Sequence, residues 1–267
     1  MVSIILCIYR NPDSMDTFLY RLRNMIECLY SFSSQTYKDL EVIIVEQYID
    51  LPYLEHIFRD TNYKYKAIQH PVFNLPWCMN VGSNISTGDL ILPFPVDSVV
   101  GPDFIDKLIN KFQGGVIFAC SELVYLTEEY TIEYINNRDY NMNLGDCRRV
   151  IMARRGDGVR GEGAPILSDR NFFFNILGGW NERYFNWGGA DCDITVRTRY
   201  LKPDWETLDY MALHLNHGGQ LPRSGDISAF EIAERFPQEV SLLIEGNCGS
   251  LEGPNPIDFE SALRSIL

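Results

Sequence analysis

The sequence lacks the cysteine spacing of a zinc knuckle or of a disulfide-rich scaffold. Its seven cysteines are scattered along 267 residues, and no Cys-x-x-Cys pair occurs. Several lie in apolar runs, as Cys7 does within residues 4–8, which is typical of small core residues. We therefore expect free thiols in a reducing compartment, and a cytoplasmic protein.

Positive charge is also scarce. The chain has 23 lysines and arginines against 36 acidic residues, which gives a net charge of -13 and a pI of about 4.7. Nucleic acids and anionic membrane surfaces are bound through a basic footprint, which this composition does not supply. We expect neither as a partner, and an anionic ligand would require a local cluster of arginine, lysine or metal.

Long apolar runs are missing as well. No window reaches the 18 apolar residues that suggest a membrane-spanning helix, so we expect no integral membrane segment. Residues 2–9 are apolar, but the run is short and no positive region precedes it, so it predicts a buried strand rather than a signal peptide. With 46% hydrophobic and 22% charged residues, the chain can bury the core of one domain.

A glycine-rich, lysine-containing phosphate loop is the last absence. No G-x-x-x-x-G-K-[ST] motif occurs, and the glycines at 158, 161 and 163 follow no predicted strand. Such loops bind phosphates through backbone N–H groups between a strand and a helix. Their absence argues against a nucleotidyltransferase or another enzyme that uses this loop.

Apolar patterns divide the first 126 residues into alternating strands and helices. Strands are predicted at residues 2–9, 40–45, 65–69 and 90–94, and helices at 15–32, 51–59, 76–85 and 102–112. This alternation predicts a doubly wound, mainly parallel α/β sheet. Ligands bind such sheets beyond the carboxyl ends of the strands, here residues 9–13, 46–48 and 95–98.

The remainder of the chain changes character twice. Residues 136–169 are rich in glycine and arginine and predict a flexible loop excursion. This segment could be a cationic flap over an anionic ligand or an ordinary solvated loop. We expect 1–126 to be a nucleotide-binding half, 170–217 an acceptor-binding and catalytic half, and 218–267 a helical extension of the same domain.

Residues 178–193 carry the strongest chemical signal. Two Gly-Gly pairs bracket an aromatic and charged stretch, and the second pair precedes Asp191 and Asp193 at the start of an amphipathic run. Tryptophan offers a flat apolar face of the kind that sugars stack on. A carboxylate at a helix start stays ionised and could act as a general base for a sugar hydroxyl. The alternative is a glycine-rich turn with an N-capping aspartate.

A second group of residues could hold a metal. Asp97 follows the predicted strand at 90–94, and His214 and His217 add imidazole nitrogens at a spacing of three residues. One carboxylate and two imidazoles can bind a divalent cation and leave positions open for phosphate oxygens. The alternative is that Asp97 caps the next element and that the histidines are ordinary polar residues.

In their order, these motifs resemble the GT-A fold nucleotide-sugar glycosyltransferases. The similarity spans residues 2–217 and is greatest to the catalytic domain of the beta-1,4-galactosyltransferases and to bacterial family-2 glycosyltransferases. It implies a Rossmann-like, mainly parallel sheet with a small antiparallel addition. The matching motifs are Arg10-Asn11, Glu46-Gln47, Phe73-Asn74, Asn80-Val-Gly82, Pro95-Val-Asp97, Gly178-Gly, Trp187-Gly-Gly-Ala-Asp191 and His214.

The resemblance also implies roles for individual residues. Asp191 would be the catalytic base. Mn²⁺ or Mg²⁺ would bind to Asp97 and His214, with His217 as a substitute ligand. The UDP-sugar donor would be bound by Ile8, Tyr9, Arg10, Glu46, Phe73, Asn74, Val96, Asp97, Trp187, Gly188 and Gly189.

At four positions the chain departs from the family pattern. Pro95 replaces the first aspartate of the Asp-x-Asp motif, and Ala190 replaces the glutamate before the base. Leu75 and Pro12 stand where the family has arginines. The departures concern the metal, the donor phosphates and the acceptor, whereas the base is retained.

The sequence therefore predicts a galactosyltransferase-like hexosyltransferase. It would move a hexose or N-acetylhexosamine from a UDP-sugar to a hydroxyl of a glycan or glycoconjugate, with metal assistance. Retaining relatives with a similar Trp-Gly-Gly block usually have asparagine at the position of Asp191, so aspartate here favours inversion. The alternative is a non-catalytic protein that binds a nucleotide sugar or a glycan on a degenerate GT-A fold.

Overall fold

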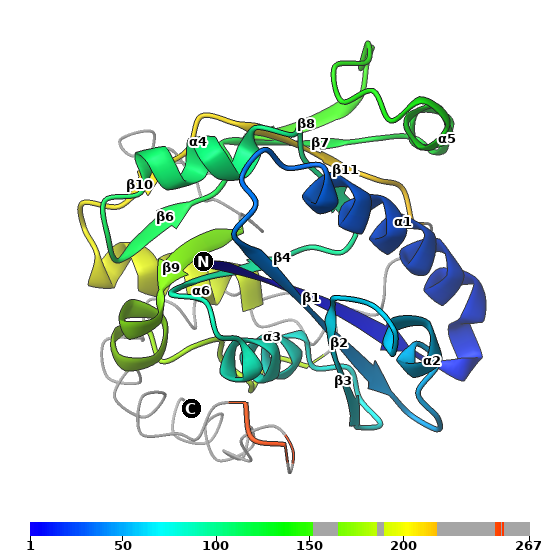
Figure 1. Cartoon of the computed structure of the whole chain (residues 1–267), viewed down its shortest axis with the longest axis horizontal. Helices are drawn as coiled ribbons and strands as arrows, with labels where there is room; N and C mark the ends of the chain where they lie inside the picture. Colours follow the sequence, from blue (N-terminus) through cyan, green and yellow to red (C-terminus); the bar gives the residue numbers. More distant parts are fainter. Residues whose placement is uncertain (152–164, 186–189, 218–248, 252, 254–267) are drawn as a thin grey trace, which may run out of the picture.

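The computed structural model describes residues 1–151, 165–185, 190–217, 249–251 and 253. They form a seven-stranded sheet and a four-stranded sheet with helices packed around them (Figure 1). Strand order in the large sheet is β10-β6-β9-β4-β1-β2-β3. The predicted α/β fold, a mainly parallel sheet with a small antiparallel addition, is confirmed.

Four neighbouring strands of the large sheet run parallel and place their carboxyl ends at one edge. All but the last residue of β1 are buried, because layers cover both faces of this central strand. These strands are β1 (Val2–Arg10), β2 (Leu40–Tyr48), β3 (Lys64–Gln69) and β4 (Leu90–Phe94). The helices between them are α1 (Met15–Ser33), α2 (Glu55–Phe58) and α3 (Leu75–Ile85), with a 3₁₀ turn, η1 (Pro12–Ser14), before α1.

Opposite faces of the large sheet are covered by different helices (Figure 1). Phe94 on β4 makes edge-to-face contacts with Phe32 of α1 and Phe104 of α4 (Phe104–Lys111), so both helices lie on its face. α3 packs on the other face, where a Cβ at Gly82 would lie 2.3 Å from Ile5 Cγ2. Glycine is required there because any larger residue would push α3 away from β1.

Strands outside the parallel set complete the large sheet. β9 (Ile166–Asp169) is antiparallel to both β4 and β6 (Val116–Phe118), and β10 (Glu206–Thr207) adds to β6. The segment 136–169 is therefore only in part a loop, because the strands at residues 148–151 and 166–169 lie within it. The apolar run that forms β9 is short, and the glycine-rich stretch before it dominates the sequence pattern. The predicted flap falls largely on residues 152–164, outside the described residues.

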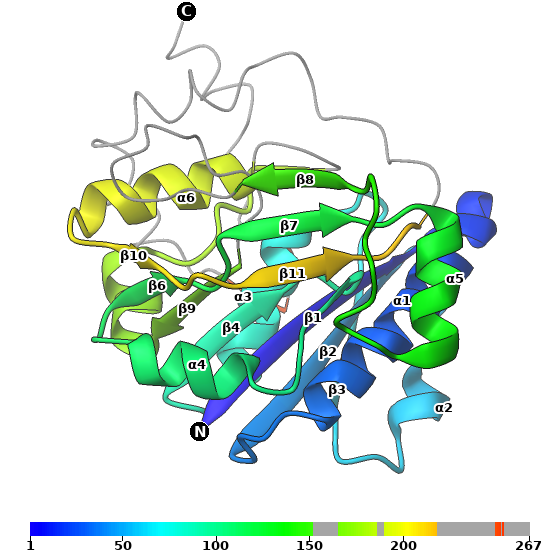
Figure 2. The same ribbon diagram turned by 90° about the horizontal axis from the view of Figure 1, so that it is seen from above.

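The small sheet lies beside α1 and has its own apolar cluster (Figure 2). Its order is β5-β11-β7-β8, and only β11 and β7 run parallel. α5 (Glu128–Asn137) packs against it through Tyr134. The strands are β5 (Ser98–Val99), β7 (Glu122–Tyr125), β8 (Arg148–Ile151) and β11 (Met211–His214).

One predicted helix is much shorter than expected. Residues 51–59 contain only the single turn of α2, because Pro52 lies in the segment and the Glu46 carboxylate accepts the N–H groups of Tyr53 and Leu54. Two further elements flank the turn that contains Gly178 and Gly179: the π-helical turn η2 (Phe172–Ile176) and α6 (Ala190–Leu201). The helices predicted within 218–267 lie outside the described residues.

Two expectations from composition can be compared with the described part of the chain. Cys7, Cys28, Cys78, Cys120 and Cys147 are buried free thiols, as expected. None of the described helices has the length and hydropathy needed to cross a bilayer.

Candidate functional site

The loop after β4 places Asp97 at the carboxyl edge of the large sheet. Its side chain is buried, and its backbone carbonyl accepts a hydrogen bond of 2.7 Å from the N–H of Leu215. Val96, one residue earlier, is also buried. The Asp97 main chain is thereby joined to the segment that follows β11.

His214 and His217 reach Asp97 from the end of β11. His214 is the last residue of this strand, which pairs with β5 on one side and with β7 on the other. Figure 2 shows β11 beside β7. The backbone N–H of Asn216 donates to Thr131 Oγ1 at 2.9 Å, and its carbonyl accepts from Arg23 of α1 at 2.8 Å. The sheet and two helices therefore fix the turn between the two histidines.

The three side chains converge on one point. His214 Nε2 lies 3.4 Å from Asp97 Oδ1, and His217 Nε2 lies 3.5 Å from Oδ2. One ligand atom of each residue lies within 4.8 Å of the others. The N–O distances are longer than ordinary hydrogen bonds of about 2.7–3.2 Å. The ligand atoms of the three side chains therefore surround a common point without forming ordinary hydrogen bonds to one another.

The electrostatic environment of Asp97 and His217 favours the protonation states that bind a cation. Burial opposes ionisation of Asp97, but the charges of His214, His217 and Arg21 outweigh burial and lower its pKa. Burial lowers the pKa of His217, so its imidazole stays neutral over a wider pH range. An ionised carboxylate and a neutral imidazole are the protonation states that ligate metals.

The donor set fits a divalent cation. It combines one carboxylate oxygen donor with two imidazole nitrogens, and imidazole favours Mn²⁺ or other transition metals over Mg²⁺. His217 Nδ1 is buried without a hydrogen-bond partner among the described residues. The residues that the sequence nominated for a metal are therefore brought together by the fold.

A row of paired residues in the small sheet supports His214. In register, His214 lies opposite Ser98 on one side and Tyr125 on the other, and Tyr125 lies opposite Arg148. The Tyr125 ring is tilted by 31° over the His214 imidazole, with centroids 4.6 Å apart, and the Arg148 guanidinium lies 5.2 Å from the Tyr125 ring. Tyr125 thus limits the rotation of His214. Its role follows from the strand pairing, which the sequence pattern did not show.

The residues predicted to bind the nucleotide lie at the same edge but are engaged within the protein. Arg10 forms an ion pair with Asp50 and donates to the carbonyl of Leu51 at 2.6 Å. Tyr9 stacks on Phe73, with ring centroids 4.8 Å apart. Ile8, Tyr9 and Phe73 are buried, so their side chains belong to the core beside this edge of the sheet.

Glu46 and its neighbour Gln47 hold the loops at this edge. The Glu46 carboxylate is fully buried and accepts from Tyr53 N, Leu54 N and the Tyr65 hydroxyl at 2.6–2.8 Å. Gln47 donates to the carbonyls of residues 70 and 72 and accepts from Asn74 N. No role was assigned to Gln47 from the sequence, although its position directly after Glu46 at the end of a strand could have indicated one. The donor-binding role of Glu46 stays a prediction.

Two motifs that lie 100 residues apart are joined by α3. Asn74 caps this helix by accepting from Trp77 N at 2.8 Å and donates to the carbonyl of Glu182 at 2.6 Å. Asn80 holds the backbone of Trp180 through both ends of its amide and donates to Glu182 Oε1. The Phe73-Asn74 and Asn80-Val-Gly82 blocks therefore position the turn that leads to α6.

The two aspartates at the start of α6 have different environments. Asp193 is fully buried and pairs with Arg197 at 2.6 Å, and Arg197 also donates to the carbonyls of Leu177 and Gly179. Gly178 and Gly179 have φ values of 74° and 69°, which glycine adopts without strain. Asp191 lies in the first turn of the helix and is partly exposed. Trp187, Gly188 and Gly189 lie outside the described residues.

Comparisons with known proteins bear on the fold of the chain. No protein-family model and no curated protein matches the sequence. Among solved structures, S. aureus TarS 1–349 superposes with a TM-score of 0.51 at 11% identity, covering 93% of this chain and 66% of that chain. The resemblance to the GT-A glycosyltransferases is therefore confirmed as a likeness of fold.

Two further solved structures to which this chain is similar contain nucleotide sugars. One is S. aureus TarS 1–349 in complex with UDP-GlcNAc, with a TM-score of 0.46, 12% identity, and coverage of 84% of this chain and 59% of that chain. The other is a Drosophila beta-1,4-galactosyltransferase 7 mutant in complex with manganese, UDP-Gal and xylobiose. It has a TM-score of 0.44, 14% identity, and coverage of 84% of this chain and 71% of that chain.

Proposed function

We propose that this protein is a metal-assisted glycosyltransferase that moves a hexose or N-acetylhexosamine from a UDP-sugar to a hydroxyl of a glycan or glycoconjugate. The observation that carries the proposal is the convergence of Asp97, His214 and His217 at the carboxyl edge of a GT-A sheet. Ligands of doubly wound sheets bind at this edge. The donor diphosphate and the metal would therefore meet at Asp97.

The metal ligands are suited to assist departure of a nucleoside diphosphate. A divalent cation bound there supplies positive charge that neutralises the leaving diphosphate. Asp97 and the two imidazoles hold this charge in a buried setting, where electrostatic interactions are stronger than in water. Because two of the three ligands are imidazole nitrogens, a transition metal such as Mn²⁺ is expected rather than Mg²⁺.

Asp191 is the proposed general base. It lies in the first turn of α6, where the N–H groups at the helix start and the helix dipole favour negative charge. Asp191 would take the proton from the acceptor hydroxyl while that oxygen attacks the anomeric carbon. The proton goes to the carboxylate, the bond to the diphosphate breaks, and the anomeric centre inverts.

A transfer assay with a matched pair of variants tests this assignment. UDP-galactose, UDP-glucose and their N-acetyl forms are incubated with Mn²⁺ and a panel of sugar acceptors, and released UDP and product are measured. Asp191→Asn should lower transfer by about 10²–10⁴-fold with UDP binding retained. Asp193→Asn should instead destabilise the fold, because it leaves the buried Arg197 without its carboxylate, at a cost of about 3–5 kcal/mol.

Transfer that survives the Asp191→Asn substitution would contradict the base. Product anomeric configuration, read by NMR, tests inversion separately. Retention of configuration would contradict direct displacement while leaving glycosyl transfer in place.

A second candidate function is supported by a different observation. Arg10, Glu46 and Asn74, which are expected to meet the nucleotide, are bound to other parts of the protein. This favours a non-catalytic protein that binds a nucleotide sugar or a glycan on the same fold. It predicts UDP-sugar or glycan binding without turnover of any donor, so donor hydrolysis that depends on Asp191 would contradict it.

A further inference from the structure

One face of α1 lies against both loops that form the metal site. Asn24 donates from Nδ2 to the carbonyls of Leu215 and Asn216 at 3.3 and 3.0 Å. Cys28, one turn further on, has its thiol 3.7 Å from the carbonyl of Pro95. Arg21 precedes Asn24 by three residues and therefore lies on the same face of the helix.

Arg21 is directed at the metal site by this packing. Its positive charge interacts with the side chains of both Asp97 and His217. Its Nε is buried and has no hydrogen-bond partner, and it takes part in none of the ion pairs, within the described part of the chain. The two neighbouring arginines differ, because Arg10 pairs with Asp50 and Arg23 pairs with Glu128.

A cation beside a metal site is unfavourable unless an anion binds both. One carboxylate and two neutral imidazoles leave a bound divalent ion with one unit of net positive charge, and Arg21 adds a second. Pro95 at the other position of the Asp-x-Asp motif contributes no negative charge that would offset it. This excess of positive charge complements a diphosphate far better than a neutral sugar.

We propose that Arg21 binds the phosphate oxygens of a diphosphate ligand alongside the metal and makes the site selective for diphosphates. The proposal rests on the proposed function in that the diphosphate is expected to be that of a UDP-sugar. Arg21 would supply the cationic contact that Leu75 and Pro12 do not provide. Its guanidinium can donate two parallel hydrogen bonds to a phosphate group.

Arg21→Gln tests the role through two affinities that should respond differently. Without nucleotide, calorimetry should show Mn²⁺ binding that is unchanged or tighter, because a repelling charge has been removed. With saturating Mn²⁺, UDP and inorganic pyrophosphate should each bind about 10- to 100-fold more weakly. Arg21→Lys should retain part of this affinity, because it keeps the charge but loses the paired donors.

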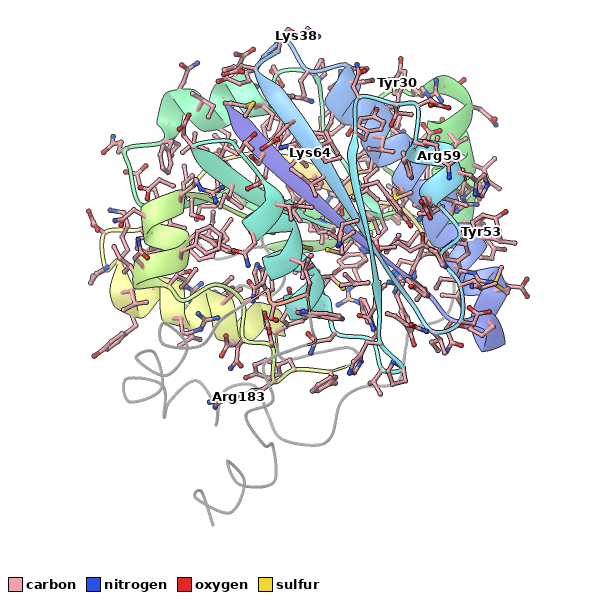
Figure 3. The ribbon with its side chains drawn as sticks, turned by 60° about the horizontal axis from the view of Figure 1, so that its bottom comes forward. Tyr30, Lys38, Tyr53, Arg59, Lys64 and Arg183 are labelled. Atoms are coloured by element: carbon pink, nitrogen blue, oxygen red, sulfur yellow. The ribbon has the colours of Figure 1, made fainter. Side chains whose placement is uncertain are left out.

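Lys38→Gln is the matched control for the loss of one positive charge. Lys38 is exposed and precedes β2, so it lies at the opposite edge of the parallel sheet from Asp97 (Figure 3). Its substitution should leave the affinities for Mn²⁺, UDP and pyrophosphate unchanged. Circular dichroism and thermal unfolding show whether each variant is folded.

Each remaining outcome decides between the inference and the proposed function. Unchanged UDP and pyrophosphate affinity in Arg21→Gln overturns the inference, as does an equal loss of Mn²⁺ binding, which would make Arg21 a structural support. Pyrophosphate binding that depends on Arg21, without UDP binding, keeps the inference and contradicts the proposed donor. If the native protein binds neither UDP nor pyrophosphate with Mn²⁺, both are wrong.

Discussion

Glu41, at the amino edge of the parallel sheet, and Asp97, at its carboxyl edge, have opposite environments. At the amino edge, Glu41 accepts hydrogen bonds from the Ser3 hydroxyl, from Thr87 and from Gly88 N, and pairs with Lys64 at 2.6 Å. At the carboxyl edge, Asp97 has two imidazoles at 3.4 and 3.5 Å, beyond ordinary hydrogen-bond length. The Glu41 carboxylate has close hydrogen-bond partners, whereas neither imidazole lies within ordinary hydrogen-bond distance of the Asp97 carboxylate.

Polar atoms around the two carboxylates show the same contrast. Near Asp97, Arg21 Nε, Ser98 Oγ and His217 Nδ1 are buried without a hydrogen-bond partner among the described residues. Buried polar groups left unpaired are costly, so such a cluster indicates a ligand or a metal. Glu41 stabilises the fold, whereas the polar atoms around Asp97 retain bonding capacity for a ligand. The following substitutions test this difference.

Asp97→Asn should have the largest effect on binding and a small effect on stability. The affinity for Mn²⁺, measured by calorimetry, should fall by more than about 100-fold, because even the outer-shell partners of a metal contribute 10–100-fold. The free energy of unfolding should change less than in Glu41→Gln, since the two imidazole nitrogens lie 3.4 and 3.5 Å from the carboxylate, beyond ordinary hydrogen-bond length. If Asp97→Asn is strongly destabilised, Asp97 stabilises the fold as Glu41 does, and the contrast between the two residues is wrong.

Glu41→Gln should show the reverse behaviour. It loses the ion pair with Lys64 and changes the acceptor pattern toward Ser3, Thr87 and Gly88. We expect a loss of about 1–3 kcal/mol in the free energy of unfolding in urea. The affinity for Mn²⁺ should be unchanged, and any loss of metal binding would break the separation of the two edges.

The contribution of Glu41 should depend on pH in a defined direction. Burial opposes its ionisation, but the hydrogen bonds from Lys64, Ser3, Thr87 and Gly88 outweigh burial and lower its pKa from 4.5 to about 2. Because the folded-state pKa is lowered, the stabilisation is complete above pH 4.5 and is lost as the pH falls toward 2. The difference in stability between native protein and Glu41→Gln should shrink over this window.

Tyr125→Leu should have the smallest effect. It removes the ring that lies 4.6 Å from the His214 imidazole but leaves all three ligands in place. We expect the Mn²⁺ affinity to fall about 3- to 10-fold, at the low end for a residue that orients a ligand. Tyr125→Phe keeps the ring and should bind Mn²⁺ like the native protein. A similar loss in both variants would point to the hydroxyl rather than to the stacking.

Much of the fold could be predicted because the relevant patterns are local. The continuous apolar runs of β1, β2 and β4 identify buried parallel strands, and the spacing of apolar residues identifies α1 and α3. β9 was hidden because a four-residue strand next to a glycine-rich stretch has no period of its own. α2 was overestimated because the capture of backbone N–H groups by Glu46 is a tertiary interaction.

The residues of the candidate site also differ in whether local sequence could predict them. Asp97, His214 and His217 could be nominated from residue type and from the position of Asp97 after a strand, and the fold brings them together. Arg21 and Tyr125 could not, because their approach depends on how α1 and β7 pack against β11. The internal hydrogen bonds of Glu46 and Asn74 were likewise invisible, because they join segments distant in sequence.

The most direct test of the central claim is a calorimetric titration of UDP into the native protein and into Asp97→Asn, each with and without Mn²⁺. The account predicts UDP binding to the native protein that requires Mn²⁺ and that is lost in Asp97→Asn. UDP binding that is the same with and without Mn²⁺, or that survives in Asp97→Asn, would contradict a metal-assisted diphosphate site at the carboxyl edge of the sheet.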